Sequence, residues 1–206
     1  MSEIKNDDIL VFNTEQNVPV KKEVKTFTLV DPTHPLLSMP LVEFDFNNPP
    51  VNANEFASTL VDTCKQMNGL GLSANQCGFP HRVFVMGAND DFIACFNPKV
   101  IQMDGEAHME EGCLTFPLLM LKITRPKTIK VEYQDFTGVK REATFDGISA
   151  RVFLHELDHM NGVLYTSRVK PLAFQFGLKK LEKNQFNINF QKEDKEMLQN
   201  VMQIHH

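Results

Sequence analysis

The pentapeptide His155-Glu-Leu-Asp-His159 constrains this chain more than any other part of its sequence. Two histidines four residues apart project from the same face of a helix, so both imidazoles can reach one small divalent cation. Glu156 lies about 100° further round such a helix, close enough to hydrogen-bond a water on that cation without ligating it. A cation lowers the pKa of such a water towards about 7, and the glutamate can then take and return a proton.

The simpler interpretation of the same motif is a solvated helix face that carries two ordinary histidines. The neighbouring residues oppose it, because Val152, Phe153 and Leu154 make this helix largely apolar. Two buried histidines side by side are costly unless they share a partner. We therefore expect a buried, metal-binding helix from about Ser149 to Asn161, with Gly162 at its C-terminal end.

A tetrahedral site with two histidines lacks one protein ligand. No histidine or glutamate downstream stands at a motif-like spacing, and the nearest histidine is His205. The ligand is therefore expected upstream, where Cys113 lies beside a glycine in a stretch that we expect to be too polar and kinked for a simple core strand. A lone cysteine is more often inert core, but a thiolate is a good ligand for Fe(II), Zn(II), Co(II) or Ni(II).

The order of the remaining elements predicts an α+β fold. Asn52 or Asn54 can cap a helix that continues to Asn68 and is followed by a glycine-rich loop. Strands are expected at 27–33, 82–86, 92–96 and 99–103, with a break at Asn97-Pro98, then in the alternating run 121–134 and its return strand 140–145. A last amphipathic segment begins at Pro171, and its Leu172, Phe176 and Leu181 are expected to dock on the core.

Charge and composition exclude several classes of protein. The net charge is −5 and no basic stripe is present, so direct readout of nucleic acid is not expected. No segment approaches the roughly 18 apolar residues of a membrane span, and the N-terminus lacks the apolar core of a signal peptide. We expect a cytoplasmic monomer. The other cysteines are expected in or near the core, as Cys64 and Cys95 in the core and Cys77 near the site.

Three motifs together resemble the signatures of the peptide deformylase family, in the same order and at similar separations. They are Gly69-Leu-Gly-Leu-Ser-Ala-Asn-Gln76, Glu111-Gly-Cys-Leu-Thr115 and His155-Glu-Leu-Asp-His159. The resemblance runs from about Asp31 to Leu181. It implies a fold with small mixed or antiparallel sheets packed around a central metal-binding helix, and a C-terminal helix. It also implies hydrolysis of the N-formyl group from the initiator formyl-methionine of nascent polypeptides, with release of formate.

The resemblance further implies a role for individual residues. The metal, Fe(II) in the first place with Zn(II), Ni(II) or Co(II) as substitutes, would be held by Cys113, His155 and His159. Glu156 would be the base, and the Gln76 side chain with the Leu114 backbone N–H would stabilise the developing oxyanion. Substrate-binding positions carried over from the family are Leu70, Gly71, Glu111, Gly112, Ile148 and Val152. The aliphatic ones could equally be plain core.

Four positions depart from the family pattern. Ser73 stands where alanine is usual, and Thr115 replaces a serine while keeping its hydroxyl. Leu154 replaces a glutamine that commonly precedes the first histidine, and Met120 stands where some relatives carry an arginine. These changes bear on the peptide preference and the rate of the reaction. They do not remove any catalytic group.

The expected organisation is an N-terminal extension at 1–26, a catalytic domain at 27–185 and a partly helical tail at 186–206. Formyl-methionyl nascent peptides are the expected partners, with the ribosome as a further candidate. Two rival functions stay open. A zinc endopeptidase would share the helix motif but need neither Cys113 nor Gln76, and a non-enzymatic relative would bind metal or formyl peptides without turnover.

Overall fold

The computed structural model describes residues 24–185 of the 206-residue chain. The predicted N-terminal extension therefore lies almost wholly, and the predicted tail 186–206 wholly, outside the described residues. The elements, in chain order, are η1 (Pro35–Ser38), α1 (Ala53–Gln66), β1 (Gly71–Ser73), η2 (Ala74–Cys77), β2 (Val83–Ala88), β3 (Asp91–Asp104), β4 (Ala107–Cys113), β5 (Phe116–Arg125), β6 (Thr128–Gln134), β7 (Lys140–Asp146), α2 (Gly147–Met160) and η3 (Tyr165–Arg168). A further helical segment occupies 171–185.

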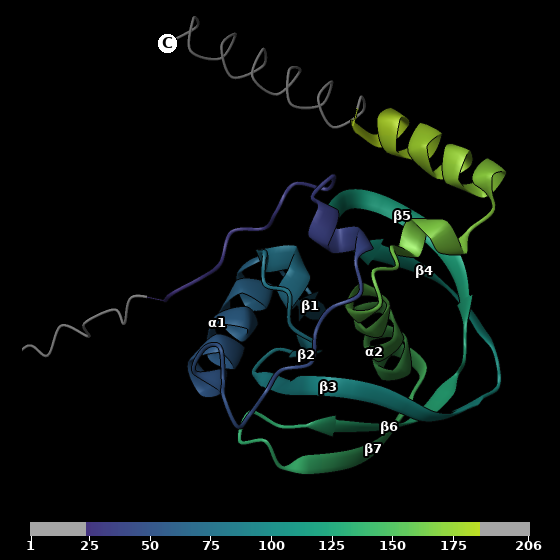
Figure 1. The fold of residues 1–206 in the computed structure, drawn as a ribbon. Helices are drawn as coiled ribbons and strands as arrows, with labels where there is room; N and C mark the ends of the chain where they lie inside the picture. The colour runs from purple at the N-terminus through teal and green to yellow at the C-terminus, as the bar shows by residue number, and fades with distance from the viewer. Residues whose placement is uncertain (1–23, 186–206) are drawn as a thin grey trace, which may run out of the picture.

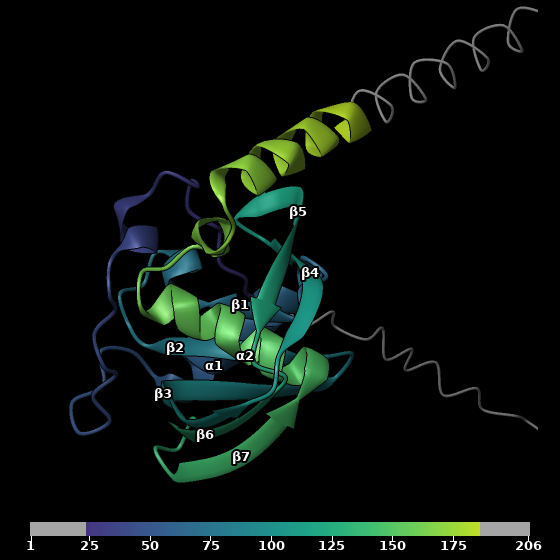
Figure 2. The same ribbon diagram turned by 90° about the vertical axis from the view of Figure 1, so that its right-hand side faces the viewer.

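Two antiparallel sheets enclose the helix that carries the histidine motif. The five-stranded sheet has the order β1-β2-β3-β6-β7, and β4 pairs only with β5. Helix α2 lies between them and packs against β1, β2, β6 and β7 (Figures 1 and 2). Phe153 of α2 packs edge-on against Phe84 of β2, with ring centroids 5.1 Å apart. The predicted α+β architecture around a central helix is confirmed.

Helix α1 begins and packs as its sequence predicts. The Asn52 side chain accepts a hydrogen bond of 3.0 Å from the Glu55 N–H, which satisfies one of the free donors of the first turn. Phe56, Leu60 and Cys64 then recur on one face and are buried against the sheet. Cys95 and Cys64 are fully buried, as expected of core cysteines.

The predicted break at Asn97-Pro98 is wrong, because β3 runs through it as one strand. Asn97 has φ 50°, and the register against β6 shifts between Phe96 and Lys99. The Asn97 side chain replaces the lost ladder bonds, since it accepts from the Phe44 N–H at 2.8 Å and donates to the Phe44 carbonyl at 3.0 Å. A bulge thus absorbs the proline within a continuous strand.

Three further predictions need correction. Residues 27–33 form no strand; the Val30 N–H instead bonds the Gln76 carbonyl at 2.9 Å. The polar stretch before Cys113 is strand β4, whose kink comes from a register shift between Glu111 and Cys113. The run 121–134 belongs to two strands, β5 and β6.

Helix 171–185 docks on β5 through a different face from the one predicted. Phe174, Leu178 and Leu181 pack in the cluster beneath it, so only Leu181 among the predicted residues docks. Leu172 and Phe176 are 62 % and 61 % exposed. Among residues 24–185, no helix is long and apolar enough to cross a membrane.

Candidate active site

Strand β4 and helix α2 bring three metal-ligand side chains together. Cys113 ends β4, and His155 and His159 lie one turn apart on α2. One ligand atom from each lies within 4.8 Å of the others, and Cys113 Sγ is 3.4 Å from His159 Nε2. All three side chains are largely buried, with 9 %, 8 % and 1 % of their surface exposed. The predicted ligands therefore form one cluster.

The chemistry of this cluster fits a divalent cation. Thiolate and imidazole ligands of a tetrahedral ion stand about 3.5 Å apart, given bond lengths of about 2.3 and 2.0 Å. The pKa of His159 is held well below its usual range. Burial is the main cause, and the neighbouring charges of His155 and Arg125 add to it, so the ring stays neutral and able to ligate. Burial also lowers the pKa of His155, but its hydrogen bonds with Cys113 and Glu111 outweigh this and raise it to about 10. A cation would replace that proton.

Glu111 fixes the orientation of the His155 ring. Its Oε2 lies 3.1 Å from His155 Nδ1, and Arg125 donates to both carboxylate oxygens, at 2.6 and 2.9 Å. Arg151 of α2 also pairs with Glu111 and donates to the Ala107 carbonyl at 2.7 Å. Burial alone would raise the pKa of Glu111, yet its hydrogen bonds with His155 and Arg125 lower it to about 2. The carboxylate is thus held ionised beside a metal-ligand histidine.

The same network ties β5 to the far end of the motif helix. Arg125 Nη1 donates to Asp158 Oδ2 at 2.8 Å, and Arg168 of η3 donates to both carboxylate oxygens of Asp158. Arg125 and Asp158 are both buried, so each charge is balanced by a partner of opposite sign. Sequence reasoning missed Arg125, Arg151 and Arg168, because nothing in a sequence distinguishes a buried arginine from a surface one. Asp158 lay inside the motif and was a signal that we did not use.

Glu156 faces the loop that contains Gly71. Its carboxyl group is buried, and burial raises its pKa to about 7, although the nearby His155 acts in the opposite direction. Its Oε2 has no hydrogen-bond partner among the described residues. A Cβ at Gly71 would stand only 2.5 Å from Glu156 Oε1 and 2.9 Å from Val152 Cγ1. Glycine is therefore required there for the loop to approach this carboxylate.

The amide of Gln76 is oriented by two of the residues that depart from the family pattern. The Ser73 backbone N–H donates to Gln76 Oε1 at 2.9 Å, and the single Ser73 hydroxyl proton can be donated to the same oxygen at 2.9 Å or to Asn75 Oδ1 at 2.8 Å. The Nε2 group consequently faces the other way, where it donates to Thr115 Oγ1 at 3.0 Å and lies 3.4 Å from Cys113 Sγ. An alanine in place of Ser73 would lose the hydroxyl bond, so this departure strengthens the orientation of Gln76.

A cavity of about 620 Å³ opens beside the cluster. Leu70 and Ile148 line it and are 49 % and 62 % exposed, while the half-buried Val152 both lines it and packs against the core. His159 lies behind this wall and is not part of it. The lining otherwise includes the remaining predicted residues, namely Gly71, Gln76, Glu111, Gly112, Cys113, Leu114, His155 and Glu156.

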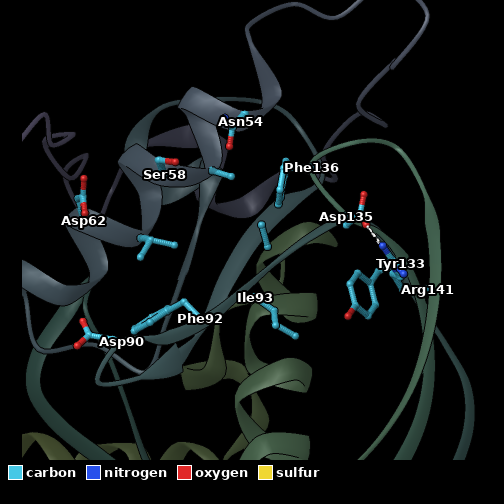
Figure 3. Close-up of a pocket in the computed structure, with 13 residues that line it drawn as sticks. Asn54, Ser58, Asp62, Asp90, Phe92, Ile93, Tyr133, Asp135, Phe136 and Arg141 are labelled. Carbon is cyan, nitrogen blue, oxygen red and sulfur yellow. Dashed lines mark hydrogen bonds and ion pairs between the residues drawn. The ribbon is translucent and has the colours of Figure 1, made fainter.

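A second cavity, of about 420 Å³, lies between α1, β3 and the β6–β7 turn (Figure 3). Its wall includes Phe92, Phe136 and Arg141, the last of which pairs with Asp135 at 2.7 Å. None of the residues predicted for the metal or the chemistry lines it. Among the described residues, those predicted for the chemistry therefore line the first cavity or, as with His159, lie behind its wall.

Comparison with known proteins gives a consistent result. The family model described as polypeptide deformylase matches residues 27–175. A peptide deformylase from Thermotoga maritima is 38 % identical over 142 residues, which cover 68 % of this chain and 84 % of that protein. One from Chromobacterium violaceum is 36 % identical over 129 residues, or 61 % of this chain and 77 % of its own length.

Solved structures of peptide deformylases have a similar fold. A Synechococcus elongatus peptide deformylase in complex with actinonin superposes with a TM-score of 0.70 and 27 % identity, covering 76 % of this chain and 86 % of that one. The Thermotoga maritima enzyme gives a TM-score of 0.63 and 35 % identity, covering 71 % and 99 %. With the fold, the ligand cluster and the extent of the family match in agreement, the chain belongs to the peptide deformylase family.

Proposed function

We propose that this chain removes the N-formyl group from the initiator formyl-methionine of nascent polypeptides by hydrolysis, releasing formate, with Glu156 as the base. The observation that carries the proposal is the convergence of Cys113, His155 and Glu156 on one cavity, with His159 completing the ligand cluster behind it. Membership of a family of metal-dependent hydrolases supports the reaction class.

Fe(II) is the proposed native metal, with Zn(II), Ni(II) or Co(II) as possible replacements at Cys113, His155 and His159. When bound, such an ion would lower the pKa of a water and polarise the formyl oxygen. The third ligand would be a cysteine that lies upstream of the histidines. This position supports the deformylase function over a zinc endopeptidase, which would use a downstream ligand.

Glu156 would perform the proton transfers of the reaction. A carboxyl group whose pKa is about 7 is well matched to accept a proton from the attacking water near neutral pH. It would then pass that proton to the leaving amine nitrogen of methionine. Its position between Gly71 and the histidines places the carboxylate at the cavity wall, where these transfers must occur.

Gln76 and Leu114 would stabilise the negative charge that develops on the formyl oxygen. Ser73 holds the Gln76 amide so that its Nε2 donor faces the Cys113 side of the cavity. The backbone N–H of Leu114, next to the cysteine ligand, would be the second donor. Two fixed donors need no reorganisation as charge develops, and this is often the largest catalytic contribution.

The cavity would hold the methionine side chain against Leu70, Ile148 and Val152. The backbones of Gly71, with Glu111 and Gly112 opposite, would align the peptide. We further propose that the protein acts in the cytoplasm as a monomer on nascent chains, with the ribosome as a possible contact.

Formate release from a formyl-Met peptide tests the proposal. The full chain would be loaded anaerobically with Fe(II) or Co(II), since an Fe(II)–thiolate site can be lost when the sulfur is oxidised. We expect stoichiometric formate and a free amino terminus. A loaded protein that releases no formate would overturn the proposal and favour a relative that binds without turnover.

A further inference from the structure

Exposed apolar side chains gather round the mouth of the active-site cavity. Met67 and Leu70 follow α1, Leu118 and Met120 lie on β5, and Ile148 opens α2. They are 39 %, 49 %, 62 %, 41 % and 62 % exposed, respectively. We call these five residues the apolar rim. Three separate chain segments thus contribute exposed apolar side chains to one patch. Such a patch is characteristic of a contact surface for another molecule.

Leu118 reaches the rim at a conformational cost. Its φ is +66°, a left-handed conformation that leucine rarely adopts. It lies in the bulge between the Cys113–Phe116 and Glu111–Leu121 pairs of β4 and β5. The strained residue is largely exposed, so core packing does not compensate for the strain. Backbone strain of this kind persists mainly where function requires it.

Met120 lies across the backbone of Gly112, directly before the cysteine ligand. A Cβ on Gly112 would stand 2.8 Å from Met120 Sδ. The side chain therefore forms part of the cavity wall and presents apolar surface beside the proposed cysteine ligand.

The cavity also provides no free cation for an acidic side chain. Among its described lining residues, Arg151 is the one arginine or lysine, and it is buried and paired with Glu111. Glu110, at the same opening, is exposed and lies 3.3 Å from Lys180. An acidic residue in the substrate would therefore meet the exposed carboxylate of Glu110, find no unpaired arginine or lysine among these lining residues, and lose the apolar contact.

We propose that Leu118 and Met120 determine specificity beyond the formyl-methionine, by selecting apolar side chains in the residues that directly follow it. This inference rests on the proposed function and deepens it. The contact would be made equally in the bound substrate and in the transition state, so its loss would raise KM and leave kcat little changed. The occupant of the rim is the substrate chain and not a second copy of this protein, because the rim lines the same cavity as Cys113, His155 and Glu156.

The test compares three peptides that differ only after formyl-methionine, in which leucine, serine or aspartate follows. With the metal-loaded full chain, we expect kcat/KM for the leucine peptide to exceed that for serine by about tenfold, chiefly through KM, with aspartate lowest. If no peptide releases formate, the proposed function fails. If all three are deformylated with equal kcat/KM, this inference alone fails.

Two variants test whether Leu118 and Met120 cause the preference for the leucine peptide. Leu118→Asn introduces a residue that tolerates the left-handed conformation better than leucine does, so we expect an equal or higher Tm. The preference for the leucine peptide should fall to about twofold. Met120→Arg should raise the relative kcat/KM of the aspartate peptide. Val139→Asn is the matched control, since Val139 is 50 % exposed outside both cavities and should change neither ratio.

Three results would overturn the inference. They are an unchanged preference in Leu118→Asn, an equal loss in Val139→Asn, and a dimer in solution that Leu118→Asn dissociates without altering selectivity. The last would show that the rim is an interface between copies.

Discussion

Glu111 Oε2 lies 3.1 Å from Nδ1 of His155, so a carboxylate from strand β4 orients a candidate metal-ligand histidine of helix α2. Arg125 and Arg151 hold that carboxylate in turn, from β5 and from α2. Ion pairs therefore join the β4–β5 sheet to helix α2 at the site. Their strength depends on the charge of Glu111, which makes them sensitive to pH.

Acid should weaken the fold through Glu111. Its pKa is lowered from 4.5 to about 2, so the folded state binds this proton less readily than the unfolded state. The resulting stabilisation is fully present above about pH 4.5 and is lost as the pH falls through about 2. It amounts to about 3 kcal/mol by the size of the shift. Urea unfolding of metal-free wild type and Glu111→Gln should show a difference that narrows over this range. A difference independent of pH would contradict the prediction.

Metal affinity should rise with pH. The pKa of His155 is about 10 without metal, since Cys113 and Glu111 favour the charged ring despite its burial. A cation must displace that proton, so the apparent association constant should increase about tenfold per pH unit between about pH 6 and 8. Competition of Zn(II) between the protein and a chromophoric chelator measures it. An affinity that does not change with pH would show that His155 is already neutral.

Gly71→Ala should reduce turnover while leaving the fold intact. The new Cβ would press on Glu156 Oε1 and Val152 Cγ1, which displaces the proposed base from its position. We expect kcat to fall by about 100-fold, since misplacement by about 1 Å has that effect. Gly112→Ala is the matched control, because its Cβ meets the flexible end of Met120 and a smaller loss is expected. Equal losses in the two variants would count against the role of Gly71.

Cys113→Ala should abolish stoichiometric metal binding. The cluster then retains two histidines, which are too few for a closed protein site. Cys77→Ala provides the control, because Cys77 is also buried nearby but contributes no ligand atom to the cluster. Metal content after gel filtration, measured by mass spectrometry, separates the two. Full metal occupancy in Cys113→Ala would support the endopeptidase alternative.

Much of the site follows from local patterns that the sequence displays directly. His155, Glu156 and His159 share a helix, and Asn52 has the capping oxygen that α1 uses. Cys113 was predicted because two histidines leave a tetrahedral metal site one protein ligand short. The helix and its cap depend on residues close in the chain, where helical geometry alone determines which side chains meet, whereas Cys113 lies far from both histidines in sequence.

The remaining features depend on contacts between distant segments. Asn97 keeps β3 continuous because its side chain reaches Phe44, a partner 53 positions away. The pairing of Arg125 with Glu111 appears only when β4 and β5 are aligned with α2. The exposure of Leu172 and Phe176 likewise depends on which face of their helix meets β5, and helical periodicity alone did not settle that choice.

Replacement of Glu156 by glutamine tests the central claim most directly. The variant retains the shape of the side chain and all three candidate ligands, but it cannot accept a proton. Formate release and bound metal should be measured on the same iron-loaded samples of wild type and Glu156→Gln. We predict equal metal content and a kcat lower by at least about 100-fold, the usual contribution of a general base. A Glu156→Gln protein that binds metal and releases formate at the wild-type rate would contradict the account.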